Sequence, residues 1–455
     1  MHESLEKAYI VAVDMGYGHQ RAVFPLEGSA TTPKKWGIDK PSIISANRYP
    51  GITKGDRRTW ENTRRIYEWM SRMTGFPFFG KRIFHVMNYF EKIDAFYPHR
   101  DLSRPTLVVR YLHRLIQSGF GKHLIDTLNE EPLPFLTSFF IPAFCAEEHG
   151  YKGQIYCLCT DSDISRVWVP HNPKQSRIIY LAPNHRVGER LKQYGILPEK
   201  IVVTGFPLPK ENTGDDKDLN VLRKSLARRV KTLDPKGIYQ KKYKEIITLY
   251  LDHVRPVIDS EKMAPLTITF AVGGAGAQSN IGVAILKSLA QKIKESKIRL
   301  NLVAGSSMRV QKKYLKALSD CGLKDYDNIH VRVIYNADKY QYFREFQDVL
   351  CDTDILWTKP SELSFYAGLG LPIVMTPPLG VQEEFNRSWL HTIGAGIEQE
   401  DPRYCAEWLF DWLDSGWLAE AAMNGFIDAP KRGTFHIENL ILHGTKTEIE
   451  DIHFL

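Results

Sequence analysis

The sequence predicts an α/β protein built from two doubly wound, Rossmann-like domains with helical insertions. Its 455 residues exceed what one ordinary hydrophobic core holds. Short apolar runs alternate with helical patterns in two successive blocks, and this alternation favours parallel sheets. Each block also opens with an apolar run that leads into a glycine-rich turn. The expected strands are 9–13, 135–140, 155–160, 178–182 and 201–204 in the first block, and 266–272, 300–304, 331–335, 354–357 and 372–375 in the second.

The order of these patterns predicts the domain boundaries. We expect an amino-terminal domain over 1–210, a second domain over 263–400, and carboxyl-terminal helices over 401–455 that return toward the first domain. Between the domains lies the polar segment 211–262, in which leucine and valine recur at helical spacing up to Leu233. It is either a linker enlarged by helices or a separate helical insertion.

The composition excludes several classes of protein. With 43% hydrophobic and 25% charged residues, the chain is of the globular and not the disordered type. It holds no apolar run of about eighteen residues that would predict a membrane span. The six cysteines are scattered, which favours a reducing cytoplasm over a disulfide framework or a zinc site. The net charge of +7 is mild, and we expect no nucleic-acid partner.

Segment 57–104 is rich in aromatic and basic residues, with eleven aromatic side chains and ten Lys/Arg against five Asp/Glu. It has two interpretations. One is a helical insertion that packs on the core. The other is a surface for peripheral contact with an anionic membrane, in which Trp69, Phe76, Phe78 and Phe79 enter the lipid boundary.

The first glycine-rich turn carries a candidate base. Gly16 and Gly18 let the chain turn sharply from the first strand into a helix, and His19 stands at the start of that helix. A histidine in isolation is usually structural, but an imidazole at this place can take the proton of an attacking hydroxyl.

Two carboxylates follow the strand near 155–160. Asp161 is a candidate to orient His19 or to act as base itself, whereas Asp163 is better interpreted as a helix cap.

The second glycine-rich turn has the context of a phosphate site, because it follows a strand and precedes a long helix. The start of such a helix offers free N–H groups and a partial positive charge to a diphosphate. Tyr335, at a later strand end, is a candidate to flank a nucleobase, with core packing as the alternative. The candidate donor residues of this turn are Gly273, Gly274, Ala275, Gly276 and Gln278.

A third cluster follows the strand near 354–357. The turn Lys359-Pro360-Ser361-Glu362 leads through a short helix and the strand entry Gly370-Leu371-Pro372 to a further helix. That helix begins with Gln382 and Glu383 and continues to Asn386, four residues after Gln382 and on the same face. Amide and carboxylate groups at the carboxyl ends of parallel strands suit a polyhydroxylated ligand.

These motifs resemble the glycosyltransferases that include the peptidoglycan N-acetylglucosamine transferases and the monogalactosyldiacylglycerol synthases. Those families carry a Gly-Gly-His turn, a Thr-Asp segment, a Lys-Pro-Gly-Gly turn and a Gln-Glu-x-x-Asn sugar clamp. The stretch Val203-Thr204-Gly205-Phe206-Pro207 is also similar to the strand that ends their amino-terminal domain. The resemblance implies two facing Rossmann-like domains (the GT-B arrangement) with the active site in the cleft between them.

This chain departs from the family pattern at the ribose contact. Aligned from Gly370, the family's glutamate falls on Phe365, and Glu362 is the nearest carboxylate that can replace it. Val381 is also inserted between Gly380 and Gln382.

The function implied by the resemblance is inverting transfer of a hexose from a nucleotide sugar, with UDP as the expected nucleotide, to a lipid or lipid-linked hydroxyl. It implies no cofactor and no metal. His19, with Asp161, would be catalytic; the second glycine turn, Tyr335, Ser361, Glu362, Gln382, Glu383 and Asn386 would bind the donor. Two alternatives stay open: a sugar-nucleotide epimerase or hydrolase of the same fold, and a non-catalytic protein that binds nucleotide sugars.

Overall fold

The computed structural model describes residues 7–446, except for 39–41, 74–91, 253, 255–263, 272, 274, 275 and 277. The chain divides into two compact units, each of which is described by itself. The first unit comprises Met1–Pro207, Leu379–Phe385 and Arg432–Leu455, and the second comprises Leu208–Pro378 and Asn386–Lys431.

The first unit is built on a six-stranded parallel sheet with the order β2-β1-β3-β4-β5-β6. Its central strands are buried on both faces, as parallel strands covered by helices are. The register pairs Ile10 with Leu136, Leu136 with Tyr156, and Leu181 with Val202. The strands are β1 (Tyr9–Ala12), β2 (Ile44–Ser45), β3 (Phe135–Thr137), β4 (Ile155–Leu158), β5 (Ile179–Ala182) and β6 (Ile201–Val203).

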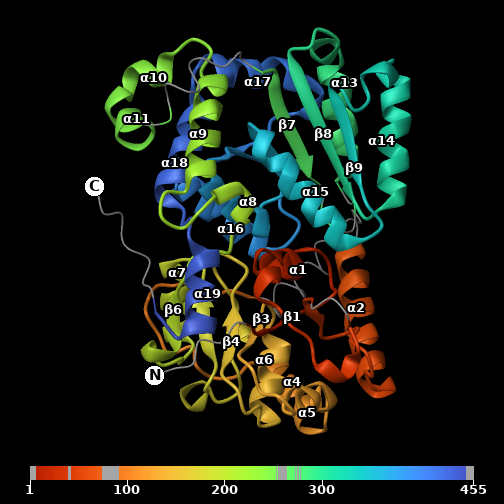
Figure 1. Ribbon diagram of the computed structural model, residues 1–455, viewed down its shortest axis with the longest axis vertical. Coiled ribbons are helices and arrows are strands. Elements are labelled where there is room, and N and C mark those ends of the chain that lie inside the picture. Colours follow the sequence, from red (N-terminus) through yellow and green to blue (C-terminus); the bar gives the residue numbers. More distant parts are fainter. Residues whose placement is uncertain are drawn as a thin grey trace. The chain divides into compact units, whose positions relative to one another are not determined.

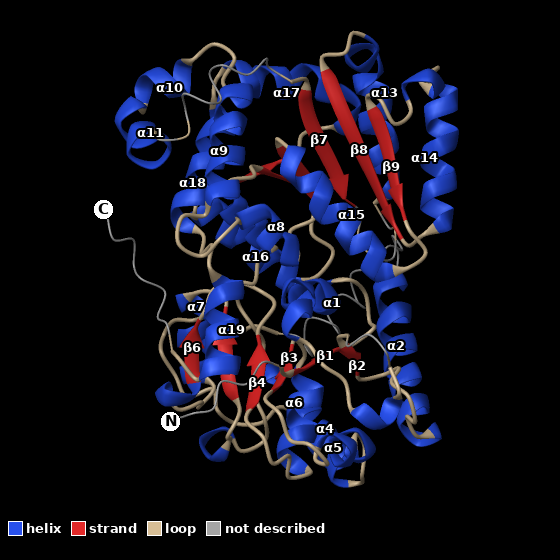
Figure 2. Ribbon diagram, viewed as in Figure 1, coloured by secondary structure: helices blue, strands red, loops and turns tan. Residues whose placement is uncertain are grey.

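Helices cover this sheet, and the last helix within the described residues is one of them (Figures 1 and 2). In α19 (Gly433–His443), Glu438 accepts a hydrogen bond from Ser29, and the ring of His436 lies 3.0 Å from the carbonyl oxygen of Thr204. The other helices are α1 (Gly18–Val23), α2 (Lys54–Met73), α4 (Leu107–Gln117), α5 (Lys122–Leu128), α6 (Phe140–Glu148) and α7 (His185–Gln193), with short 3₁₀ turns η1 (Phe24–Ser29), η2 (Lys34–Trp36), η3 (Arg166–Trp168), η4 (Pro173–Gln175) and η5 (Pro198–Lys200).

The second unit has its own six-stranded parallel sheet, with the order β12-β11-β10-β7-β8-β9. Trp357 and Phe270 pair across β10 and β7, and both are fully buried. The strands are β7 (Leu266–Ala271), β8 (Ile298–Gly305), β9 (Val331–Tyr335), β10 (Ile355–Thr358), β11 (Ile373–Met375) and β12 (Gly396–Glu398).

The helices of the second unit include the predicted helical segment that follows β6 and precedes β7 in the sequence. A buried arginine anchors this segment. Arg229 on α9 donates to the carbonyl oxygens of Thr353, Leu369 and Gly370, so α9 holds both ends of the stretch that leads to β11. The helices are α8 (Lys210–Thr213), α9 (Asn220–Leu233), α10 (Ile238–Lys242), α11 (Lys244–Leu251), α13 (Ser279–Lys294), α14 (Met308–Asp320), α15 (Lys339–Asp352), α16 (Val381–Thr392, whose first five residues group with the first unit), α17 (Cys405–Asp414) and α18 (Trp417–Asp428), with 3₁₀ turns η6 (Lys324–Tyr326), η7 (Glu362–Leu369) and η8 (Pro402–Tyr404).

The predicted fold class is confirmed: both units are doubly wound α/β structures with parallel sheets. Every strand expected from the sequence is present, and the two strands that were not expected, β2 and β12, are the short edge strands.

Only part of the aromatic and basic segment 57–104 lies within the described residues. There Trp60 is buried and its ring packs 5.2 Å from that of Phe120, as a core-packing insertion requires. The side chains of Trp69, Phe76, Phe78 and Phe79 lie outside the described part of the chain. No helix in the part of the chain that the structure describes has the length and apolar character to cross a membrane.

Candidate functional sites at the two switch points

The first sheet changes its winding direction between β1 and β3. From β1 the chain adds β2 on one side, and β3 to β6 follow on the other. The loops that leave two neighbouring parallel strands in opposite directions open a crevice at their carboxyl ends, where ligands of doubly wound proteins bind. The loop after β1 carries His19, and the loop after β3 carries Ser138.

His19 is fixed in orientation by the backbone of Ser138. Its Nδ1 lies 2.8 Å from the Ser138 carbonyl oxygen, and the Ser138 hydroxyl donates to the His19 carbonyl oxygen at 2.7 Å. Because a carbonyl oxygen only accepts, Nδ1 carries the proton, and the neutral ring has its lone pair on Nε2. The ring packs against Phe139 and Trp168, with centroids 4.6 Å and 6.3 Å away. The geometry therefore presents Nε2 as the basic atom.

The two carboxylates after β4 have different surroundings. Asp161 is partly buried in the loop that follows β4, the strand next to β3, and its proposed role at the reacting hydroxyl stays a prediction. Asp163 is buried and forms a two-pronged ion pair with Arg190 of α7, in which both N···O distances are 2.8 Å. The expected helix cap at Asp163 is wrong, because the short helix that follows, η3, has Ser165 as its N-cap residue.

The glycine turn that precedes His19 is held by Asn47, which follows β2. The Asn47 side chain accepts from the backbone N–H of Asp14 and donates to the Asp14 carbonyl oxygen. Gly16 has a φ of +102°, which favours glycine, and is exposed, whereas Gly18 is the first residue of α1. The loop thus has a defined shape beside the start of α1.

The second sheet changes direction between β7 and β10, and the loops after these strands meet. The Lys359 side chain lies directly over Gly273: a Cβ on residue 273 would lie 3.0 Å from Lys359 Cε and 3.7 Å from its Nζ. This approach brings an ammonium group beside the backbone of the glycine-rich loop, and a side chain at position 273 would displace the end of Lys359.

Two more cations reach the same loop from α14, the helix after β8. Gly276 has a φ of +65°, and a Cβ there would lie 2.6 Å from Val310 and 4.0 Å from Arg309 Nη2. Lys313, one turn after Arg309, donates to Ser279 Oγ at 3.0 Å and also to Asn280 Oδ1. Burial and the charge of Arg309 lower the pKa of Lys313. We call Arg309, Lys313 and Lys359 the loop cations.

The sequence pattern did not reveal Arg309 and Lys313. A sequence signal for these two cations exists: they are four residues apart at the start of a helix that follows a central strand. Their contact with a loop more than thirty residues earlier depends on the strand order, which the sequence pattern does not give.

Gln278 ties the glycine-rich loop to the end of β11. Its amide donates to the Pro377 carbonyl oxygen and accepts from Thr376 Oγ1, both at 2.8 Å. Gln278 is also the N-cap residue of α13, yet its side chain makes no cap hydrogen bond there. Its expected role toward the donor stays a prediction, and its observed role is to fix where α13 begins.

The turn after β10 places the remaining nucleotide candidates. Ser361 is half-exposed and precedes η7, and Glu362 is the first residue of η7 and only 8% exposed. Phe365, which occupies the expected ribose position, is buried with its ring 5.0 Å from that of Trp389. Tyr335 is half-buried at the end of β9, the far edge strand of the sheet.

The expected sugar clamp lies on α16, which begins where the sequence predicts. Asn386 is fully buried and donates to the Pro360 carbonyl oxygen at 3.3 Å, which links α16 to the turn after β10. Glu383 accepts from the backbone N–H of Leu379 at 2.7 Å, within the first turn of its own helix, and Gln382 is half-exposed. Gly274 and Ala275 lie outside the described residues.

Chemically, the second switch point is suited to an anion. The start of α13, with its partial positive charge, coincides with the three loop cations. Among the described residues, no three His, Cys, Asp or Glu side chains cluster as a bound metal ion would require.

Comparison with known proteins finds one family model that matches part of the chain. A family described as a domain of unknown function, DUF6938, matches residues 252–347. No curated protein matches the sequence.

Several solved structures are similar over most of the chain. A UDP co-structure of MnaA from S. aureus has 12% identity and a TM-score of 0.46, covering 98% of this chain and 99% of its own. MurG from Acinetobacter baumannii has 13% identity and a TM-score of 0.45, covering 96% and 100%. The UDP-GlcNAc 2-epimerase of Methanocaldococcus jannaschii, in complex with UDP-GlcNAc and UDP, has 13% identity and a TM-score of 0.39, also covering 96% and 100%. Sequence identities and TM-scores this low assign no chemistry to this chain, whose function is inferred from its own residues.

Proposed function

We propose that the protein is an inverting hexosyltransferase that uses a nucleotide sugar, with UDP as its nucleotide, and a lipid or lipid-linked hydroxyl as acceptor. The observation that carries this proposal is the convergence of Arg309, Lys313 and Lys359 on the glycine-rich start of α13. A diphosphate is the anion that such a site fits, because backbone N–H groups and several cations can share its charge. The same groups would stabilise the diphosphate as it departs.

His19 supplies the second half of the chemistry in this proposal. Its Nε2 takes the proton of the acceptor hydroxyl, and the oxygen attacks the anomeric carbon from the face opposite the diphosphate. The bond between the anomeric carbon and the diphosphate oxygen breaks, and the nucleoside diphosphate leaves with both electrons. The Nδ1 contact with Ser138 supports this role because it sets the tautomer that the reaction needs.

The sugar contacts are proposed for Gln382, Glu383 and Asn386, and the ribose contact for Glu362. The lipid acceptor has its support in the charge of segment 57–104, which carries ten basic against five acidic residues.

One observation favours a second candidate function, which is nucleotide-sugar binding without transfer. Phe365 is buried against Trp389 where a ribose-binding carboxylate is expected, and Glu362 beside it is largely buried. A protein that only senses a nucleotide sugar would keep the loop cations and would not need His19.

The first test is calorimetric titration of the protein with UDP, GDP and their common sugar conjugates. One conjugate should bind more tightly than its free nucleotide. Lys313→Met should weaken binding of UDP about tenfold, the effect of removing one hydrogen bond to a charged group. Lys312→Met on the same helix is the matched control, because that side chain is exposed, and it should leave the affinity unchanged. Equal affinities for the two variants would contradict the diphosphate site.

The donor that binds can then be incubated with the enzyme and a lipid extract. Label from the sugar should appear in a lipid product with release of the nucleoside diphosphate. Conversion of the donor to another sugar nucleotide would indicate an epimerase, and an unchanged donor would favour the binding protein.

A further inference from the structure

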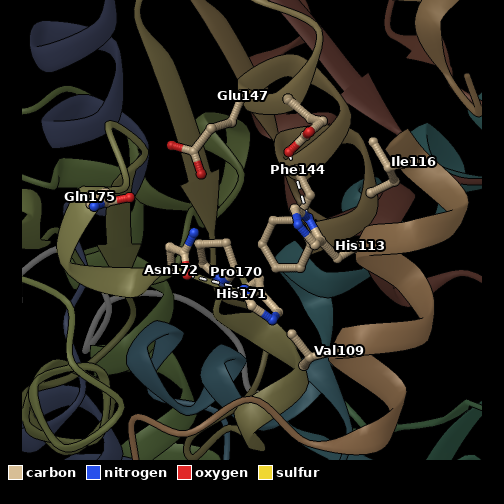
Figure 3. A pocket seen from close by; sticks show the side chains of 10 residues that line it. Val109, His113, Ile116, Phe144, Glu147, Pro170, His171, Asn172 and Gln175 are labelled. Atoms are coloured by element: carbon tan, nitrogen blue, oxygen red, sulfur yellow. Dashed lines mark hydrogen bonds and ion pairs between the residues drawn. The ribbon is translucent and has the colours of Figure 1, made fainter. Parts of the chain in front are cut away.

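A cavity of about 180 Å³ lies in the first unit at the opposite end of α6 from His19 (Figure 3). The residue before α6, Phe139, packs on His19, while Glu147 and Glu148 at its end line the cavity. Nine helical residues separate the two places by roughly 13 Å. Helix α4 and the loop 170–175 complete the lining, so the cavity is distinct from the proposed catalytic residues.

One part of the cavity wall is apolar. Val109 and Ile116 project from α4, and the ring of Phe144 on α6 and Pro170 add to this surface (Figure 3). A volume of this size matches a ligand of about one small ring, since an engineered apolar cavity of about 150 Å³ accommodates benzene.

The polar part of the wall carries two carboxylates and no lysine or arginine. Both Glu147 oxygens lie within hydrogen-bonding distance of the Ser176 hydroxyl, at 2.9 and 3.2 Å, and one of them accepts the backbone N–H of Arg177 at 2.7 Å. These contacts aim the carboxylate without giving it a cationic partner in the cavity lining. Burial raises the pKa of Glu147, and its hydrogen bonds and the nearby charge of Arg177 oppose this shift.

Two imidazoles form the rest of the lining. The rings of His113 and His171 are stacked, with centroids 4.6 Å apart and an angle of 14° between their planes. His113 Nδ1 lies 3.5 Å from Glu148 Oε2, and His171 Nδ1 lies 3.0 Å from Asn172 Oδ1.

We propose that this cavity binds a small organic cation, an ammonium or guanidinium group on a short apolar arm. The carboxylates of Glu147 and Glu148 attract the charged end, and the apolar wall covers the arm. The Phe144 ring adds a π-face, toward which organic cations are drawn. The proposal stands apart from the hexosyltransferase function and does not depend on it.

The site has a defined pH dependence. The titratable groups that line it are Glu147 and Glu148 on α6, His113 on α4 and His171 in the loop, while Lys174 and Arg177 stand next to it outside the lining. Because burial raises the pKa of Glu147, acidification neutralises this carboxylate earlier than a solvated one. Its loss of charge weakens the attraction for a cation, so affinity should fall as the pH is lowered.

Titration of the full-length protein with benzylammonium, followed by NMR or calorimetry, tests the proposal. Saturable binding is expected for benzylammonium, and benzyl alcohol, its neutral counterpart of similar shape, should bind at least about tenfold more weakly. Glu148→Gln should reduce the affinity for benzylammonium about tenfold. Glu189→Gln, which removes a carboxylate from an exposed pair with Lys192, is the matched control and should have no effect.

Ile116→Trp, which fills the cavity, provides a second test and should abolish binding of both compounds while the circular dichroism spectrum stays native. Equal binding of benzyl alcohol and benzylammonium, binding that is unaffected by Glu148→Gln, or the absence of saturation would each overturn the proposal.

Discussion

The imidazole of His19 is oriented by a hydrogen bond to a backbone atom. The Ser138 carbonyl oxygen holds Nδ1, and Ser138 follows a strand 119 residues later in the chain. Sequence spacing could not reveal this partner, because β1 and β3 become neighbours only through the order of the sheet. The sequence was enough to propose His19 as a base, whereas the identification of Nε2 as its basic nitrogen follows only from the fold.

Replacement of His19 by Ala should reduce the rate of sugar transfer by a factor of roughly 10² to 10⁴, the usual contribution of a general base. Binding of the donor should be nearly unchanged, because the loop cations belong to the second sheet. Single-turnover transfer and calorimetry of the same variant measure the two quantities. Strong remaining turnover would reject His19 as the base; His443→Ala, on the exposed end of α19, controls for nonspecific loss.

At the scale of elements, the strands were largely predictable because apolar runs bounded by turns have few other interpretations. The predicted strand 266–272, for example, contains β7 (Leu266–Ala271). Strands β2 (Ile-Ser) and β12 (Gly-Ile-Glu) were missed because each has a single apolar side chain and therefore leaves no apolar run. The loop cations of α14 were missed for another reason: a helix was expected there, but its contact with the glycine-rich loop was not.

Helix α7 shows how an element is held in place by one buried pair. Arg190 is fully buried and contacts both oxygens of Asp163, whereas Arg186 reaches the same carboxylate with a side chain that is 46% exposed. Arg190→Met should lower the free energy of unfolding by about 3–5 kcal/mol, because it removes the buried partner that contacts both oxygens of Asp163. Arg186→Met should change it by less than about 1 kcal/mol.

Urea denaturation of the two arginine variants and the wild type measures this difference. A comparable loss of unfolding free energy in both variants would contradict this prediction. It would mean that the two arginines stabilise the fold equally, whether buried or exposed.

At the scale of the whole molecule, buried tyrosines determine the response to alkaline pH. Burial raises the pKa of Tyr9 to about 12, with smaller contributions from Glu131 and Glu130, and burial also raises the pKa of Tyr151, Tyr194 and Tyr314. Above pH 10 the unfolded chain loses phenolic protons that the folded chain keeps. The stability from these groups is therefore complete below about pH 10 and declines as the pH rises toward 12.

Phenolate absorbance and circular dichroism, recorded together from pH 8 to 12, check this expectation. The buried phenols should ionise in the same step in which the secondary structure is lost. Ionisation of all tyrosines well before unfolding would show that the hydroxyls are accessible to solvent in the native state.

The path of the chain through its two units has a consequence for how the protein is made. Helix α19 belongs to the first unit but follows the whole of the second unit in the sequence. The ribosome therefore synthesises it after the second unit. All segments of the second unit, through Lys431, are therefore synthesised before the first unit has its full set of helices. Until α19 has been synthesised, Ser29 and Thr204 cannot form their contacts with Glu438 and His436. The half of the molecule that is synthesised first is thus the half that can be completed only last.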